Sequence, residues 1–265
     1  MEHGLDAAEG HPQYATISPA GLALLFAEGE RPSPQTIVDV VEEARRSGLL
    51  ARVSHRPEPD AGWLELLASG LTFDLLGLAP AEAAAPVAVY QSFGFEGDAA
   101  AASATAAALE AIELVPSGHI AAGAGLDPVL RIMMGLAANI ALHLPVAAVS
   151  WRPAQTLMEP RYFSRIVLNW LGGGAFPALG LTALMRAADG SLATRGLAHF
   201  TGQEMQLEGR EGEAPGETIK LAIRVIDHLV RVGRITETER AGAGPDTLLF
   251  EPSQVGKLVL VWRGD

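Results

Sequence analysis

The stretch DPVLRIMMGLAANIALHLPVAAVSW, residues 127–151, is apolar over almost its whole length, and Asp127 and Arg131 are its only charged residues. A membrane-spanning helix needs roughly 20 uninterrupted apolar residues. This run is interrupted before that length by Asn139, His143 and Pro145. The stretch therefore predicts a helix over residues 129–144, covered on most sides, which leads into a buried strand containing Val146 and Val149.

The chain before this stretch shows the signals of strands and one amphipathic helix. An apolar run at residues 20–29 has strand length, and residues 33–48 carry helix signals, with Ser33 as a cap, Pro34 at the first turn and Gly48 at the end. Strand-like runs follow at residues 49–55 and 63–78. The predicted order is strand, helix, strand, strand.

An alanine-rich region with prolines, residues 79–111, is interpreted as the connection between two halves of the chain. It contains one expected strand, residues 86–93, and one expected helix, residues 98–111, with Asp98 as its cap. We therefore place an N-terminal α/β half at residues 16–97 and a C-terminal α/β domain at residues 98–265.

The C-terminal half alternates strands with helices. Residues 111–125 predict two short strand pieces, and the Asp127-Pro128 pair predicts a capped helix start. Asp189-Gly190 predicts a hairpin turn. Further strands are expected at residues 204–208 and 256–262, and further helices at residues 159–171 and 215–233. The pattern predicts an α+β (mixed α/β) fold of two similar-sized β-α-β-β-type halves whose sheets are covered by helices.

Composition limits the function. The chain has 31 acidic and 19 basic side chains, a net charge of -12, which disfavours nucleic acid as a partner because the summed field repels phosphates. It has no cysteine, so thiolate chemistry and cysteine-ligated metals are excluded. The first residues lack the basic start and apolar run of a secretory signal. The sequence predicts a cytoplasmic protein that binds neither nucleic acid nor membrane.

No cofactor or metal site is predicted. Gly123 and Gly125 precede a helix, but the third glycine of the dinucleotide pattern is missing, and a tight turn is the simpler interpretation. The histidines of the second half have neither H-x-H nor H-E-x-x-H spacing, so local structure places no two of them together as ligands.

Two groups of residues are candidates for a binding site. Trp151 and Arg152 lie at the end of a predicted strand, where an arginine can present its donors to an anion. Polar residues gather in LATRGLAHFTGQEMQLEG, residues 192–209, with the candidates Thr194, Arg195, His199 and Glu204. The structural alternatives are a tryptophan that closes the core and an Arg195–Glu204 pair across two strands.

In combination, SGHIAA with Asp127-Pro128, VAAVSW, EPRYF and TRGLAHFTGQEMQLEG resemble domain of unknown function family 4261, an uncharacterised bacterial family. The resemblance covers about residues 112–262. It is most specific at Thr194, Gly196, Leu197, Phe200 and Glu204. Thr201-Gly202 follows Phe200, where the family pattern has glycine directly after phenylalanine. The resemblance implies an α/β domain and no established activity.

These observations predict a bacterial binding or protein-interaction module with an unknown protein or a small anionic ligand as partner, and they allow a homodimer. The recognition surface is expected at the Trp151 strand end and the Arg195 hairpin. The alternative is an enzyme acting on a small anionic substrate. In that case Arg152 or Arg195 binds the anion, and His199 and Glu204 have acid–base roles.

Overall fold

The strand β1 (Leu22–Phe26) is buried at every residue and lies inside an eight-stranded sheet of a computed structural model. The structure describes residues 21–46, 48–96, 99–210, 212–242 and 247–264. The strand order is β2-β3-β4-β6-β1-β7-β8-β5, and all neighbours are antiparallel except β8 and β5. The other strands are β2 (Ala51–His55), β3 (Trp63–Ala68), β4 (Leu71–Leu76), β5 (Gln91–Phe93), β6 (Glu110–Pro116), β7 (Ala148–Trp151) and β8 (Thr156–Met158).

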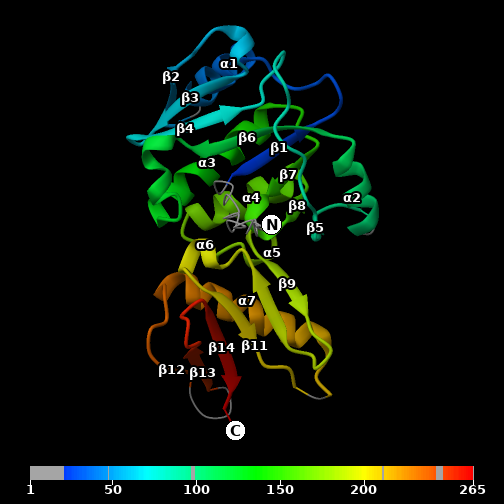
Figure 1. Cartoon of the computed structure of the whole chain (residues 1–265), viewed down its shortest axis with the longest axis vertical. Coiled ribbons are helices and arrows are strands. Elements are labelled where there is room, and N and C mark those ends of the chain that lie inside the picture. The colour runs from blue at the N-terminus through cyan, green and yellow to red at the C-terminus, as the bar shows by residue number, and fades with distance from the viewer. Residues whose placement is uncertain (1–20, 47, 97–98, 211, 243–246, 265) are drawn as a thin grey trace, which may run out of the picture.

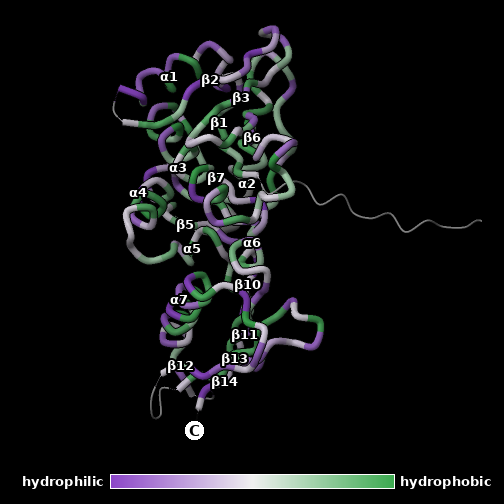
Figure 2. The backbone as a smooth tube through the Cα atoms, turned by 90° about the vertical axis from the view of Figure 1, so that its left-hand side faces the viewer, coloured by the Kyte–Doolittle hydropathy of each residue, from purple (hydrophilic) through white to green (hydrophobic). Residues whose placement is uncertain are grey.

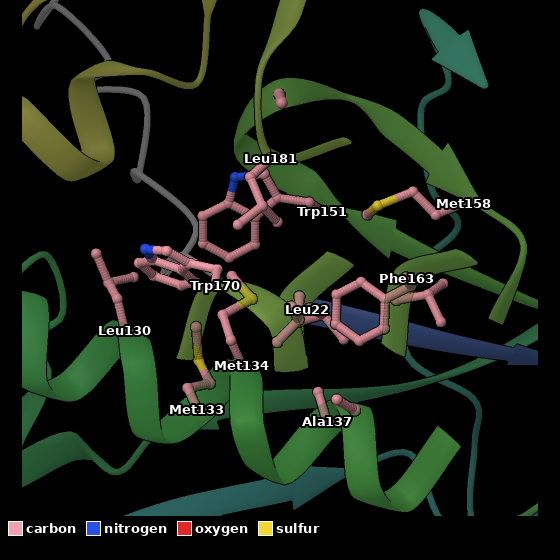
Figure 3. Close-up of a cluster of buried hydrophobic side chains, with 14 of the residues drawn as sticks. Leu22, Leu130, Met133, Met134, Ala137, Trp151, Met158, Phe163, Trp170 and Leu181 are labelled. Carbon is pink, nitrogen blue, oxygen red and sulfur yellow. The ribbon is translucent and has the colours of Figure 1, made fainter. Parts of the chain in front are cut away.

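Helices cover both faces of this first sheet because β1 is apolar on both faces. Leu22, Leu24 and Phe26 belong to the cluster under α1 (Pro34–Arg46), α3 (Asp127–His143) and α4 (Pro160–Leu171). Ala23 and Leu25 belong to a smaller cluster with α2 (Ala99–Ala107) on the opposite face. α1, α4 and the sheet all contact α3, so nearly all of its sides are covered and carry apolar residues. Figure 3 shows its Leu130, Met133, Met134 and Ala137 among side chains of β1, β7 and α4.

A second sheet has six strands in the order β12-β13-β14-β11-β10-β9. Its strands are β9 (Ala183–Arg186), β10 (Leu192–Arg195), β11 (Glu204–Leu207), β12 (Glu239–Ala241), β13 (Leu248–Pro252) and β14 (Leu258–Arg263). β11 and β14 are parallel, and the other pairs are antiparallel. The helix α7 (Pro215–Val232) packs on one face through a buried stripe that includes Ala222, Ile226 and Leu229.

The two sheets lie end to end along the long axis of the molecule, with the short segments α5 (Ala178–Leu181) and α6 (Ala198–Thr201) between them (Figure 1). Seen from the side, α3, α4 and α7 lie along the same side of the two sheets (Figure 2). The α+β fold predicted from the sequence is confirmed. No helix in the described ranges combines the length and the hydropathy needed to cross a bilayer.

The predicted boundary between residues 97 and 98 does not separate the two sheets. β6, β7 and β8 follow that boundary in the chain but belong to the first sheet, where β6 and β7 flank β1. The sheets divide after β8, in the segment that holds α4 and α5. The alanine-rich connection therefore lies between two strands, β4 and β6, of the same sheet.

Several local predictions are corrected. The second strand piece expected within residues 111–125 is a short 3₁₀ helix, Gly118–Gly123, and only residues 91–93 of the expected strand 86–93 are extended in a sheet. Pro86 has no N–H for a ladder, and its carbonyl instead accepts a hydrogen bond from Arg152. The cap residue of α3 is Leu126, whereas Asp127 lies in the first turn. Val146 is half-buried, and Asp98 lies outside the described residues.

Candidate functional site

Trp151, the last residue of β7, is completely buried. Its ring centroid lies 5.7 Å from that of His199 and 6.0 Å from that of Phe200, so it joins the first sheet to the segment around α6. The indole Nε1 is buried and has no hydrogen-bond partner among the described residues. Trp151 therefore belongs to the core between the two sheets, and the exposed recognition surface expected at this residue is not found.

Arg152 is held by three partners within the chain. Its Nε lies 2.7 Å from Glu113 Oε1, and its two terminal nitrogens donate to the carbonyls of Ala85 and Pro86, at 2.5 and 3.0 Å. Burial raises the pKa of Glu113, and the charge of Arg152 opposes that rise. The Arg152 guanidinium therefore binds the segment that precedes β5 on one side and β6 on the other. Its donors bond to acceptors within the chain.

Glu204, at the start of β11, accepts hydrogen bonds from four groups. Oε2 accepts from Thr194 Oγ1 at 2.7 Å, and the backbone N–H groups of Gly196, Leu197 and Ala198 donate to the carboxylate at 2.8 to 3.3 Å. The N–H of Met205 also donates to the buried Thr194 hydroxyl, at 2.8 Å. A carboxylate that accepts from successive N–H groups before a helix fixes the path of the chain. Glu204 and Thr194 therefore hold the turn from β10 into α6.

Arg195 does not pair with Glu204. Its guanidinium donates to Gln155 Oε1 and lies 5.3 Å from the ring centroid of Tyr90, so it contacts the first sheet's side of the joint. The next residue, Gly196, has φ +91°, and a Cβ built there would lie 2.7 Å from the Cβ of Ala154. The hairpin therefore approaches the turn after β7 closely, and a cross-strand ion pair is replaced by contacts between the two sheets.

His199, in α6, is half-buried with its ring against Trp151. Burial lowers its pKa, and the negative charge of Glu204 opposes that change. Trp151 and His199 thus contact each other, whereas the contacts of Arg195 are with Gln155 and Tyr90. Of the three candidates for catalysis, Glu204 and His199 interact through charge, Arg195 binds Gln155, and none lines the cavity described next.

A cavity of about 410 Å³ lies between α7 and the strands β12, β13 and β14, and sequence reasoning missed it. Its lining is Arg210, Glu213, Glu217, Leu221, Arg224, Val225, His228, Ala241, Gly242, Thr247, Leu248, Phe250 and Arg263. Leu221, Arg224, Val225 and His228 follow the spacing of one helix face, beside the buried stripe of α7. The helical spacing of these four residues is the sequence signal that could have pointed to the cavity. The opposite wall, β12 and β13, was not predicted.

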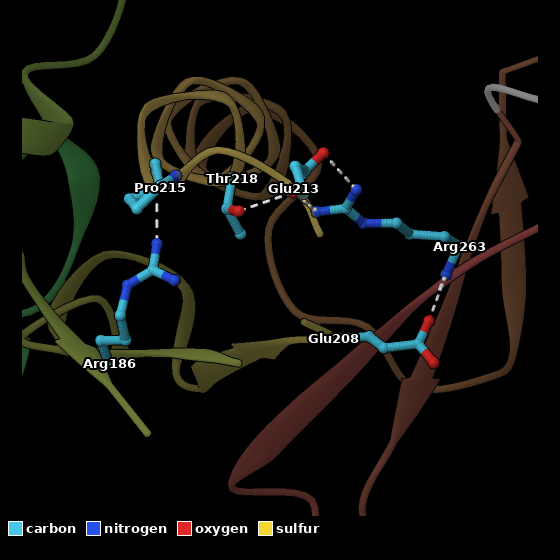
Figure 4. A network of polar contacts seen from close by, with 6 residues as sticks. All are labelled: Arg186, Glu208, Glu213, Pro215, Thr218 and Arg263. Atoms are coloured by element: carbon cyan, nitrogen blue, oxygen red, sulfur yellow. Dashed lines mark hydrogen bonds and ion pairs between the residues drawn. The ribbon is translucent and has the colours of Figure 1, made fainter. Parts of the chain in front are cut away.

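Glu213 and Arg263 form a two-pronged ion pair at this cavity (Figure 4), with both N–O distances 2.7 Å. Thr218 Oγ1 donates to the same carboxylate at 2.6 Å. The hydrogen bonds from Arg263 and Thr218 lower the pKa of Glu213 to about 2. Glu208 accepts from the backbone N–H of Arg263 at 3.1 Å. Arg263 is thereby fixed and its charge compensated.

Two other arginines of the lining lack a direct partner among the described residues, although the charge of Arg210 also contributes to the lowered pKa of Glu213. Arg210 and Arg224 are exposed, and neither side chain has a hydrogen bond or ion pair with a residue that the structure describes. Glu217, the other carboxylate of the lining, pairs with Lys220 at 2.8 Å. The cavity therefore combines free guanidinium donors with an apolar floor that includes Leu221, Val225 and Phe250.

The described residues contain no group of three or more His, Asp or Glu side chains arranged to hold a metal ion. Comparison of the chain with family models, curated proteins and solved structures found no match in any of the three.

Proposed function

We propose that the protein is a binding module that holds a small anionic ligand in the cavity between α7 and β12–β14. The observation that carries this proposal is the pair of guanidinium groups, Arg210 and Arg224, that line the cavity without a direct ion pair to any residue that the structure describes. Arginine presents a planar fork of donors that fits carboxylate and phosphate groups. A cavity of about 410 Å³ also has the size of small-molecule sites.

The charge of the whole molecule makes this cavity distinctive. A chain with a net charge of -12 repels anions at most of its surface, so an anion site requires a local excess of arginine. The sequence placed the anion at Arg152 or Arg195 instead. Both of those side chains already donate to acceptors in the chain, which favours a structural role for them. The same reasoning favours a structural role for His199 and Glu204 over acid–base catalysis.

The remaining sequence-based expectations stay as parts of the proposal. Membership of domain of unknown function family 4261, a bacterial cytoplasmic location, a protein partner and a homodimer are predictions that rest on the sequence alone. None of them is needed for ligand binding in the cavity, because every lining residue belongs to one chain.

Thermal unfolding with a panel of small anions tests the proposal, because a ligand that binds the folded state raises Tm by mass action. The panel contains acetate, 2-naphthoate and inorganic phosphate. At least one of them is expected to raise the Tm of the wild type by several degrees at about 100 times its Kd. The same anion is expected to have little effect on Arg224→Gln.

Arg231→Gln is the matched control, since Arg231 lies on the same helix, is exposed and pairs with Asp227 away from the cavity. It removes the same charge and should leave the ligand response intact. Equal loss of the response in both variants, or no response of the wild type to any anion, would refute a site at the cavity.

A further inference from the structure

We infer that the ligand of this cavity is a singly charged carboxylate with a flat apolar body, such as an aromatic monocarboxylic acid. This inference rests on the proposed function and names the class of ligand. It follows from three features of the lining: the excess of charge, the aromatic wall and the order of residues along α7.

The charges of the lining leave room for one anionic group. Counted over the lining side chains alone, three guanidinium groups (Arg210, Arg224 and Arg263) and two carboxylates (Glu213 and Glu217) leave a formal excess of one positive charge, and Glu217 also pairs with Lys220 outside the lining. With its pKa at about 2, Glu213 keeps its negative charge across the physiological range. A ligand with two or three negative charges would therefore meet fixed carboxylates that repel it, whereas one carboxylate is fully compensated.

Beside the arginines, the lining from α7 and β13 is apolar and partly aromatic. The rings of His228 and Phe250 lie 5.2 Å apart between centroids, at an angle of 44°, and both line the cavity. Leu221, Val225 and Leu248 complete that wall. A flat ring system packs well against such side chains, and burial of apolar area stabilises it by about 25 cal/mol per Å².

The order of the lining residues along α7 determines how a ligand is oriented in the cavity. Arg224 lies three residues after Leu221 and four before His228, so the three side chains lie on one face of the helix. A carboxylate bound by Arg224 therefore has apolar contacts available one turn away in either direction. Arg210 belongs to the segment between β11 and α7 and lines the same cavity.

Calorimetric titration with a matched ligand series tests the class. We expect 2-naphthoate to bind at least tenfold more tightly than acetate, which lacks the body, and than 2-naphthalenemethanol, which lacks the charge. It should also bind more tightly than naphthalene-2,6-dicarboxylate, which carries a second charge. Leu221→Ala is expected to weaken 2-naphthoate severalfold and to leave acetate unchanged, while Val232→Ala, exposed on the same helix, changes neither.

The possible failures are distinguishable. Tighter binding of inorganic phosphate or of the dicarboxylate, lost in Arg224→Gln, would overturn the class of ligand and keep anion binding. Equal affinity for 2-naphthoate in Leu221→Ala and wild type, with unchanged thermal unfolding, would also overturn it. Absence of binding by every member of the series, phosphate included, would overturn both the class and the proposed function.

Discussion

Glu204 illustrates how a single side chain shapes this molecule. The alternation of polar and apolar residues placed it in a strand, as the structure confirms. Its carboxylate then accepts from Thr194 and from three successive backbone N–H groups at the start of α6. A polar residue in a dense polar stretch thus has an architectural role here, because buried N–H groups need acceptors.

A substitution at Gly196 tests whether the close approach of the hairpin to the first sheet affects stability. Alanine at this position would place its Cβ 2.7 Å from the Cβ of Ala154 and would keep a left-handed backbone at φ +91°. We expect Gly196→Ala to lower the free energy of unfolding by about 2 to 4 kcal/mol, the sum of backbone strain and overpacking. Urea denaturation measures the change.

Gly173→Ala is the matched control, because Gly173 has a similar φ of +95° but nothing within 4 Å of a built Cβ. It should show the backbone strain alone, about 1 to 2 kcal/mol. Equal effects of the two substitutions would show that the close approach at Ala154 contributes nothing to stability.

The ion pair of Glu213 predicts a pH dependence. The pKa of this carboxyl is about 2 in the folded protein and ordinarily 4.5, so folding favours its ionised form. That stabilisation is present above the ordinary value and is lost as the pH falls toward 2. The Tm difference between wild type and Glu213→Gln should therefore be largest above pH 5 and shrink as the pH is lowered to 2.

Thr218→Val separates the hydrogen bond from the ion pair, since it removes the Thr218 donor and keeps Arg263 in place. It should lower Tm less than Glu213→Gln and retain most of the pH dependence. A constant Tm difference between wild type and Glu213→Gln from pH 7 to pH 2 would contradict the assignment.

The sequence predicted the bounds of a helix correctly where the signals for that helix lie in the same few residues. α1 and α7 begin and end where caps, prolines and glycines predicted, because these signals act through the backbone of the same few residues. The four-residue α6 was missed, since its first turn depends on a carboxylate from β11. The short strand β8 was missed as well, because it is defined by its neighbours β7 and β5.

The cap of α1 is testable at this scale. The N–H of Thr36 donates to Ser33 Oγ at 3.2 Å. We expect Ser33→Ala to lower the free energy of unfolding by about 0.5 to 2 kcal/mol, because that N–H then lacks its acceptor. Ser33→Asp should retain the cap and most of the stability in the same denaturation experiment. A loss for Ser33→Asp as large as that for Ser33→Ala would argue against capping.

For the whole molecule, the joint between the two sheets is held by side chains that cross it. Trp151 packs on His199 and Phe200, Arg195 donates to Gln155, and Gln91 bonds to the edge strand β9. The Gln91 amide donates to the carbonyl of Leu184 at 3.0 Å and accepts from its N–H at 2.9 Å. A side chain of the first sheet thereby satisfies the open edge of the second.

Gln91→Ala is expected to loosen this joint, because it leaves both backbone groups of Leu184 without their acceptor and donor. Native-state hydrogen exchange at the Leu184 amide should become faster by roughly tenfold for each 1.4 kcal/mol of lost local stability. Gln206→Ala, in the middle of β11, is the control. An unchanged exchange rate at Leu184 in Gln91→Ala would show that this bridge is not stabilising.

The sequence by itself determined the apolar character of α3, the hairpin at Asp189-Gly190, the amphipathic α7 and the α+β class. All of these depend on periodicity and turn chemistry within a few residues. Only the tertiary structure decided that β6 and β7 flank β1, that Glu204 caps α6 and that a cavity with free arginines lies under α7. These features join residues far apart in the chain, and a strand's periodicity specifies which face is buried without specifying its neighbour.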